Sequence, residues 1–135
     1  MNRSVLLALV VATALLAIGA AALSAGSGTN TPDARRTVPA PVDGLEVLIR
    51  ESAPPQVSLK ITAGLPSGCA QPHSHQLTRS GNTISVTVLN SMPTGEPICT
   101  MIYGSYELTV DLGSEFEPGT TYTVQVNDKT TAFKT

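Results

Sequence analysis

The sequence predicts an all-β fold: a seven-stranded antiparallel sandwich of two sheets that follows an N-terminal apolar helix. From residue 42 onward, apolar and polar residues alternate with a period of two, which is the pattern of half-buried strands. Turn signals rich in Gly, Pro and Asn interrupt this alternation about every eight to twelve residues. Short strands with this spacing favour two packed sheets over a helical or doubly wound fold.

The N-terminal region, residues 1–25, is predicted to be a targeting segment. Residues 5–23 carry no charge, and small residues that suit signal-peptide processing follow them. A run of this length is also long enough to cross a bilayer, so a cleaved signal peptide and an uncleaved signal anchor both stay open. Either one predicts an exported protein, secreted or periplasmic, or anchored to the outer face of the cytoplasmic membrane.

Residues 26–41 are predicted to form a flexible linker, because Ser, Gly, Thr, Ala and Pro predominate there without apolar periodicity. The folded domain is then expected to span residues 42–135. A domain of this size has only a small hydrophobic core, so a covalent cross-link contributes more to its stability than it would in a larger protein.

The first four strands of the domain are predicted at residues 44–51, 56–63, 75–79 and 83–89. The first ends before two consecutive prolines, which cannot donate to a sheet ladder. The second has the clearest alternation, with Val57, Leu59 and Ile61 on one face and polar residues on the other. The third and fourth form a hairpin across a Ser-Gly-Asn turn, with Ile84 and Val86 facing the core.

The last three strands are predicted at residues 104–112, 120–127 and 130–134. Leu108 and Val110 alternate with polar side chains in the first of them, and Tyr122 and Val124 do so in the second. An Asn-Asp-Lys turn, typical of tight chain reversals, joins the last two strands.

The run Pro-Gly-Thr-Thr-Tyr-Thr-Val-Gln-Val at residues 118–126 resembles the corner and penultimate strand of fibronectin type III and bacterial immunoglobulin-like domains. The resemblance implies that the hydroxyl of Tyr122 bonds back to the preceding corner. From Leu65 to the terminal Val-Asn pair, the chain also resembles small exported bacterial domains of uncharacterised function. That wider resemblance implies no catalytic residues. Unlike antibody domains, the chain has no core tryptophan.

Cys69 and Cys99 are the only two cysteines, and each follows a turn signal at the edge of an alternating strand. An even number of cysteines behind an export signal predicts a disulfide. If every connection between strands reverses direction, both cysteines lie at the end of the sandwich where the chain enters from the linker. The disulfide should therefore join two neighbouring loops at that end.

His73 and His75 are candidate metal ligands, because an H-x-H pair on a regular strand projects both rings to one face and can chelate Zn or Cu. Met92 and Met101 lie in the loop that the disulfide would bring near them, which suits copper. A metal site needs three or four ligands, and the sequence has no further histidine. Two solvated loop histidines are therefore the plainer interpretation, and no cofactor is predicted.

The candidate interaction loop spans residues 91–101 and includes Ser91, Met92, Pro93 and Met101. Its prolines and the predicted disulfide would hold it in a restrained, extended form, which lowers the entropic cost of binding a partner. A protease-inhibitor loop is one narrower form of this hypothesis. A stapled connection without a partner is the plainer interpretation.

Composition disfavours several classes of function. The formal net charge is −2, and the weakly acidic chain lacks the clustered cations that nucleic acid or anionic lipid requires. Aromatic residues are few, which disfavours a stacking platform. No nucleophile elbow or phosphate-binding glycine loop is recognisable, so we expect no enzymatic activity.

The sequence therefore predicts a non-enzymatic exported binding or accessory module of the cell envelope. Its partner would be an unidentified protein or envelope component, and it would contact the membrane only through the N-terminal segment if that segment is not cleaved. An envelope metal-binding protein that uses the histidine pair is the alternative. The sequence makes no prediction of oligomeric state.

Overall fold

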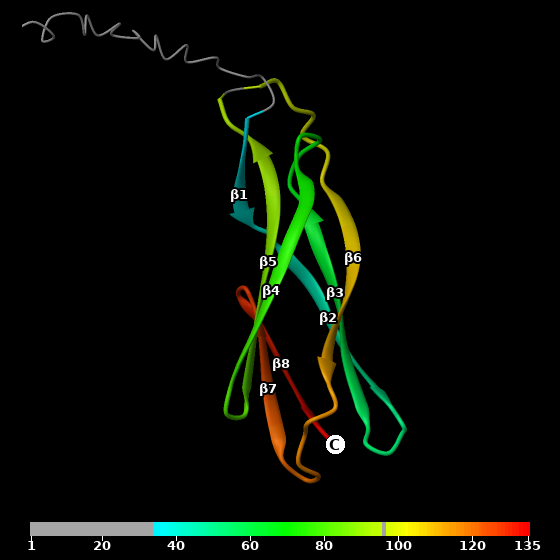
Figure 1. The fold of residues 1–135 in the computed structure, drawn as a ribbon. Coiled ribbons are helices and arrows are strands. Elements are labelled where there is room, and N and C mark those ends of the chain that lie inside the picture. Colours follow the sequence, from blue (N-terminus) through cyan, green and yellow to red (C-terminus); the bar gives the residue numbers. More distant parts are fainter. Residues whose placement is uncertain (1–33, 96) are drawn as a thin grey trace, which may run out of the picture.

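The computed structural model describes residues 34–95 and 97–135, which form eight strands in two sheets (Figure 1). The strands are β1 (Arg35–Pro39), β2 (Val42–Arg50), β3 (Gln56–Leu65), β4 (Gln71–Ser80), β5 (Thr83–Pro93), β6 (Gly104–Gly113), β7 (Thr121–Val126) and β8 (Lys129–Lys134). Within this part of the chain, no helix is long and apolar enough to span a membrane. The expected targeting segment and its apolar helix lie outside the described residues.

The two sheets have five and three strands. The larger sheet has the order β1–β5–β7–β8, with β4 paired to the other edge of β5, and the smaller has the order β2–β3–β6. Thr83–Val86 of β5 pair with β7, and Leu89–Pro93 of β5 pair with β1, so these two strands share one edge of β5. The outer strands β4 and β6 therefore form one open side of the sandwich.

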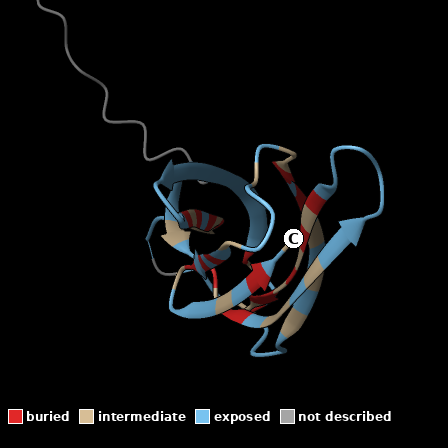
Figure 2. Ribbon diagram, turned by 90° about the horizontal axis from the view of Figure 1, so that it is seen from below, coloured by how far each residue is buried: buried red, intermediate tan, exposed pale blue. Residues whose placement is uncertain are grey.

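The core lies between the sheets and is formed by buried residues of both. Figure 2 shows these buried residues in red. The alternation in the sequence is realised in β3, β5 and β7, whose inward residues are buried while the residues between them are more exposed. The largest fully buried side chains come from these three strands: Val57, Leu59, Ile61, Ile84, Val86, Val88, Asn90, Val124 and Val126. The prediction of an all-β sandwich is thus confirmed.

Strand β1 corrects two predictions, the linker over residues 26–41 and the count of seven strands. Arg35–Pro39 pairs with β5, and Ala40 is buried in the core. Only Val38 among the five strand residues is partly buried, so the segment lacks the alternation that marks a strand in the sequence. Its conformation depends on the pairing partner rather than on its own pattern.

The pairing of β5 with β7 corrects the expectation of a fully antiparallel sandwich. These strands run parallel, from Thr83 opposite Thr123 to Val86 opposite Val126, whereas the other five strand pairs are antiparallel. Sequence neighbours joined by short turns are expected to be antiparallel, but β5 and β7 are separated by β6, which belongs to the other sheet.

Asn127 bridges the break between β7 and β1 along the edge of β5. Its backbone is in the left-handed region, with φ at 49°, which the turn between β7 and β8 requires. Its Nδ2 donates to the carbonyls of Ala40 (2.7 Å) and Val88 (3.0 Å), and its Oδ1 accepts from the Val88 amide (3.0 Å). One side chain therefore continues the hydrogen bonding of the sheet where neither strand reaches.

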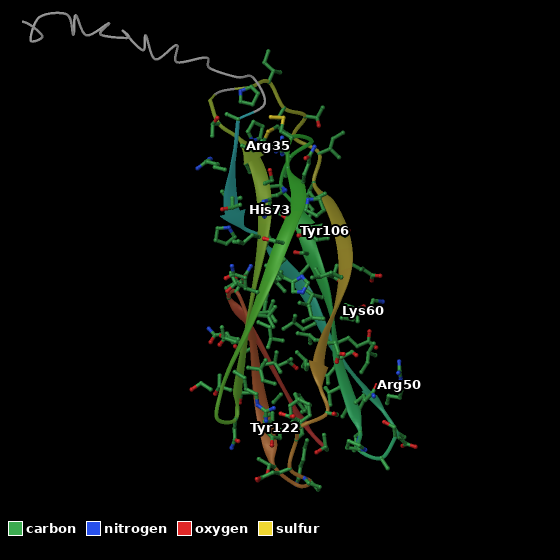
Figure 3. The ribbon with its side chains drawn as sticks, in the orientation of Figure 1. Arg35, Arg50, Lys60, His73, Tyr106 and Tyr122 are labelled. Carbon is green, nitrogen blue, oxygen red and sulfur yellow. A yellow bond between two sulfur atoms is a disulfide. The ribbon has the colours of Figure 1, made fainter. Side chains whose placement is uncertain are left out.

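The corner before β7 contains the hydrogen bond that the fibronectin resemblance implies. The buried hydroxyl of Tyr122 accepts a hydrogen bond from the Glu117 amide at 2.8 Å. The rings of Phe116 and Phe133 pack against Tyr122, with centroids 4.9 and 5.5 Å away, and the Arg79 guanidinium lies 4.7 Å above the Phe116 ring. This cluster stabilises the end of the sandwich remote from the cysteines (Figure 3).

Candidate functional site

Cys69 and Cys99 form a disulfide, with their Cα atoms 5.5 Å apart. Cys69 lies between β3 and β4, and Cys99 lies between β5 and β6. The chain enters at the same end, because the Thr94 amide and hydroxyl both donate to the Ala34 carbonyl, at 2.8 and 2.9 Å. We term this end, formed by Ala34 and the two cysteine-bearing connections, the disulfide pole (Figure 3). This is the end at which both cysteines are expected if every connection between strands reverses direction.

The connection from β5 to β6 exposes four large apolar side chains. Ile98 is 102% exposed, Met101 85%, Ile102 72% and Tyr103 53%. Elsewhere in the described chain the large apolar side chains with high exposure are Leu48 and Ile49 on β2 and Leu77 on β4, each near two-fifths exposed. We term residues 97–103 the apolar loop. A concentration of exposed apolar side chains in one segment is typical of sites that contact another molecule.

The apolar loop is fixed to the neighbouring connection by its backbone as well as by the disulfide. The Gly68 amide donates to the Thr100 carbonyl at 2.9 Å. A Cβ at Gly68 would lie 2.0 Å from the Thr100 hydroxyl oxygen, so only glycine permits this approach without displacement. The loop is therefore held at two consecutive residues, Cys99 and Thr100.

Tyr103 fixes the end of the apolar loop to β2. Its hydroxyl donates to the Asp43 carboxylate, with distances of 2.8 and 2.9 Å to the two oxygens. The hydrogen bond to the Asp43 carboxylate, with smaller contributions from desolvation and charge, raises the pKa of Tyr103 above its usual 10.0. The ring crosses Gly64, where a Cβ would lie 1.8 Å from the hydroxyl oxygen.

Arg35 of β1 binds the end of β5 and the connection from β3 to β4 at the disulfide pole. Its Nε donates to the Ser91 hydroxyl, and its Nη2 donates to the carbonyls of Ser91 and Cys69, each at 2.8 Å. The guanidinium can serve three acceptors because its donors lie in a rigid planar fork. The predicted linker therefore supplies a residue that orders the site.

The predicted interaction loop, residues 91–101, is wrong in its first three residues. Ser91, Met92 and Pro93 are the last residues of β5 and pair with β1, and Ser91 is buried. Their backbone is therefore committed to the sheet. Of the four side chains proposed from the sequence, Met101 is the one that projects from the apolar loop.

The other exposed side chains of the apolar loop were not predicted from the sequence, although the apolar composition of this segment could have indicated them. Residues 97–103 hold several apolar residues without the period of two that marks a strand, between a turn rich in proline and the predicted strand at 104. Apolar residues that neither alternate nor belong to a strand have no core face to fill. Ile98 lies within the predicted loop but was not singled out, and Ile102 and Tyr103 lie beyond its predicted end.

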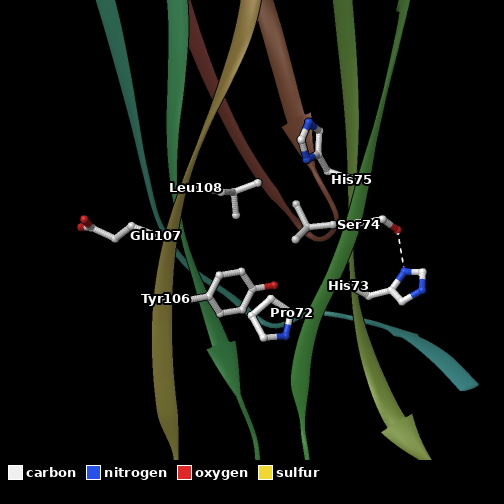
Figure 4. A pocket seen from close by; sticks show the side chains of 8 residues that line it. Pro72, His73, Ser74, His75, Tyr106, Glu107 and Leu108 are labelled. Atoms are coloured by element: carbon white, nitrogen blue, oxygen red, sulfur yellow. Dashed lines mark hydrogen bonds between the residues drawn. The ribbon is translucent and has the colours of Figure 1, made fainter. Parts of the chain in front are cut away.

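The histidines lie on β4 but do not form the expected chelating pair. The register slips between Pro72 and Ser74, so His73 is the extra residue of a β-bulge. The bulge breaks the alternation, and Figure 4 shows the rings of His73 and His75 on different sides of the strand. The His73 ring instead hydrogen-bonds Ser74, with Nδ1 and Oγ 2.8 Å apart. Among the described residues, no group of three His, Cys, Asp or Glu side chains could hold a metal ion.

A shallow groove of about 390 Å³ separates the two edge strands β4 and β6 (Figure 4). Below it, the fully buried Asn90 joins the sheets: its Nδ2 donates to the Gly64 carbonyl at 2.8 Å, and its Oδ1 accepts from the Tyr106 hydroxyl at 2.7 Å. Burial raises the pKa of Tyr106 above 10.0. The Asn90 side chain and the Tyr106 hydroxyl therefore hold the two sheets together. The groove walls are largely apolar and are formed by Pro72, Val88, the Tyr106 ring and Leu108.

Comparison with known proteins identifies the family. Two proteins from Herpetosiphon aurantiacus are similar: the uncharacterized 10.2 kDa protein in the HgiCIIM 5' region is 31% identical over 93 residues, and the one in the HgiBIM 5' region is 34% identical over 83 residues. These alignments cover 69% and 62% of this chain, and 97% and 99% of the relatives. No solved structure matches the chain. The model of the ORF11 beta-sandwich domain matches residues 59–135, and the chain belongs to this family.

Proposed function

We propose that this protein is a non-enzymatic, exported binding or accessory module of the cell envelope that contacts its partner through the apolar loop. The observation that carries the proposal is the exposure of Ile98, Met101 and Ile102 in one segment whose backbone is held in place. Burial of one such side chain contributes about 1.5–3 kcal/mol. A partner that covered all three would therefore gain a substantial part of its binding free energy from them.

Restraint of the apolar loop supports a binding role. The disulfide, the Gly68–Thr100 hydrogen bond and the Tyr103–Asp43 hydrogen bond all act on residues within or next to the loop. A loop that is already ordered loses less conformational entropy when it binds. The same contacts also keep the apolar side chains exposed, because the restrained backbone of the loop cannot rearrange to bury them against the sandwich.

Export is supported by two features. Disulfides persist in oxidising compartments, and the Cys69–Cys99 disulfide joins the only two cysteines of the chain. Residues 5–23 are uncharged and apolar, as in a signal peptide or signal anchor. Both features agree with action outside the cytoplasm.

We further propose that the sandwich is a variant of the immunoglobulin-like or fibronectin type III-like arrangement. The hydrogen bond of Tyr122 to the corner before β7 supports this assignment. Strand β1 and the parallel β5–β7 pair are departures from a plain seven-stranded antiparallel sandwich. These departures concern the larger sheet, whereas the three-stranded sheet is antiparallel throughout.

Site-specific photo-cross-linking in bacterial cells that express the full chain tests the binding proposal. A photoreactive amino acid at Met101 should form an adduct with an envelope component. The matched control is the same amino acid at Leu48, which is also apolar and exposed but lies on β2 towards the opposite end. Equal adducts from the two positions, or none from Met101, would contradict the proposal.

Export is tested on the same cells by fractionation and mass spectrometry of the intact protein. We expect the protein in the envelope or the culture medium, with Cys69 and Cys99 oxidised. The mass also shows whether residues 1–25 have been removed. Recovery from the cytoplasm with two free thiols would contradict export.

A further inference from the structure

We infer that the partner of the apolar loop is lipid: the disulfide pole rests on the bilayer interface, with Ile98, Met101 and Ile102 inserted at the boundary between headgroups and acyl chains. The inference rests on the proposed function, because it names the partner of the same loop. It goes beyond an N-terminal anchor, since it assigns a second membrane contact to the folded domain itself.

The path of the chain places the disulfide pole next to the membrane when the apolar run is inserted. Residues 24–33 join the end of that run to Ala34, and ten residues span at most about 35 Å. Ala34 is hydrogen-bonded to Thr94, in the same connection that carries the apolar loop. The end of the sandwich nearest to the anchoring point is therefore the end that exposes the apolar side chains.

The composition of the apolar loop fits a bilayer interface. Residues 97–103 read Pro-Ile-Cys-Thr-Met-Ile-Tyr and contain no charged residue, so none of their own side chains carries an ion into the acyl-chain region. Tyr103 keeps its hydroxyl on Asp43 while half of its surface is exposed, which suits the headgroup level where aromatic rings gather.

The shape of the apolar loop favours lipid over a second copy of the chain. Ile98 is as exposed as a side chain can be, and Met101 follows closely, so these side chains protrude rather than line a hollow. A protruding apolar side chain needs a fluid or a concave acceptor. The groove between β4 and β6 is one apolar hollow of the described surface, but it is shallow and lies along the side of the sandwich.

The contact is expected to be apolar rather than electrostatic. The chain is weakly acidic overall, and of the two arginines that the structure describes at the start of β1, Arg35 is bound to Ser91 and Cys69. Insertion should therefore occur in zwitterionic bilayers, and added anionic lipid should change it little.

Single-tryptophan reporters test the inference, because the chain has no tryptophan of its own. Ile98→Trp places the reporter in the apolar loop, and Leu48→Trp is the matched control near the opposite end. Both full-length variants are reconstituted in phosphatidylcholine vesicles with and without brominated acyl chains. For Ile98→Trp we expect emission at shorter wavelength and several-fold stronger quenching by bromolipid than for Leu48→Trp.

A second substitution shows whether the loop itself inserts. In the Ile98→Trp background, Ile102→Asp should remove most of the quenching, whereas Leu48→Asp should leave it unchanged. Both positions are exposed, so neither change disturbs the core. Equal quenching in these two double variants would overturn the inference.

The outcomes separate this inference from the proposed function. If Ile98→Trp shows water-like emission in vesicles while Met101 cross-links to an envelope protein, the lipid assignment falls and the binding module stands. If neither signal appears, both proposals fall. A blue shift without vesicles that grows with protein concentration would assign the loop to a second copy and overturn the lipid assignment.

Discussion

Gly64 leaves room for the ring of Tyr103 at the disulfide pole, because glycine has no Cβ. In Gly64→Ala the new methyl group would overlap the Tyr103 hydroxyl and displace the end of this surface side chain from Asp43. We expect the pKa of Tyr103 to fall towards 10.0, with little loss of stability, because the hydrogen bond to Asp43 is the main cause of the elevation. Titration of the Tyr103 ring carbon by NMR measures the change.

Two further variants make this prediction specific. Asp43→Asn should lower the pKa of Tyr103 by removing the charged acceptor. Gly104→Ala should leave it unchanged, since a Cβ there meets Leu65 at an ordinary 3.7 Å. An unaltered Tyr103 titration in Gly64→Ala would show that the ring does not lie across Gly64.

Tyr106→Phe tests the buried hydrogen bond between the sheets. The substitution leaves the Asn90 Oδ1 without its donor in a fully buried position. We expect the free energy of unfolding to fall by about 1–3 kcal/mol, measured by urea denaturation. The control is Tyr103→Phe, whose exposed hydroxyl should contribute less than about 0.5 kcal/mol. Equal effects of the two substitutions would mean that Asn90 does not depend on Tyr106.

Tyr106 also makes stability depend on alkaline pH. Burial raises its pKa in the folded state above the unfolded value near 10.0, so the neutral phenol is favoured by folding. This contribution is complete below pH 10.0 and is lost as the pH rises through the folded-state pKa. Urea midpoints measured across this range should fall with pH, and less steeply in Tyr106→Phe. Parallel curves for the two proteins would exclude Tyr106 as a cause.

At the scale of the elements, Asn127 connects β1, β5 and the turn from β7 to β8. Asn127→Gly keeps the left-handed backbone but loses the side-chain hydrogen bonds to Ala40 and Val88. We expect this loss to lower the free energy of unfolding by about 1–3 kcal/mol. Asn127→Ala also strains the backbone, which should lower the free energy of unfolding by roughly another 1–2 kcal/mol. Denaturation and amide exchange at Val88 measure these effects. If alanine were tolerated better than glycine, the left-handed conformation would not be maintained.

The strands that could be predicted are those whose own side chains fill the core. The predicted strand at 56–63 became Gln56–Leu65 and that at 104–112 became Gly104–Gly113, because one face of each carries the apolar residues. Strand β1 could not be predicted, since its pairing with β5 and the contacts of Arg35 are made with residues far along the chain. The bulge at His73 could not be predicted either, because an extra residue in one strand is recognised only from its pairing with the partner strand.

At the scale of the whole molecule, the disulfide constrains the unfolded chain. In the chain-entropy model, a loop with the separation of Cys69 and Cys99 stabilises by roughly 3–4 kcal/mol. For a domain of this size, we expect reduction to lower the melting temperature by roughly 10 °C or more. Thermal denaturation followed by circular dichroism, with and without reductant, measures the shift. The Cys69→Ala, Cys99→Ala double variant should melt like the reduced protein and be insensitive to reductant, and a melting curve unchanged by reduction would contradict the prediction.

The location of the candidate site was more predictable than its residues. Reversal of direction at each connection was enough to bring Cys69 and Cys99 to the end where the chain enters. Which side chains protrude there depends on where β5 ends. Since β1 extends the pairing of β5 to Pro93, the exposed segment begins later than the turn signals suggested.

The pairing of β1 with β5 also determines how the domain would respond to mechanical load. A pull transmitted through residues 24–33 would reach the fold at Ala34 and act along the axis of β1. Because hydrogen bonds between antiparallel strands are perpendicular to the strands, such a force shears all of them together instead of breaking them one by one. The bonds of Arg35 to Ser91 and Cys69 lie one residue after the point where the force enters the fold. A domain tethered at this end would thus resist extension at its point of attachment.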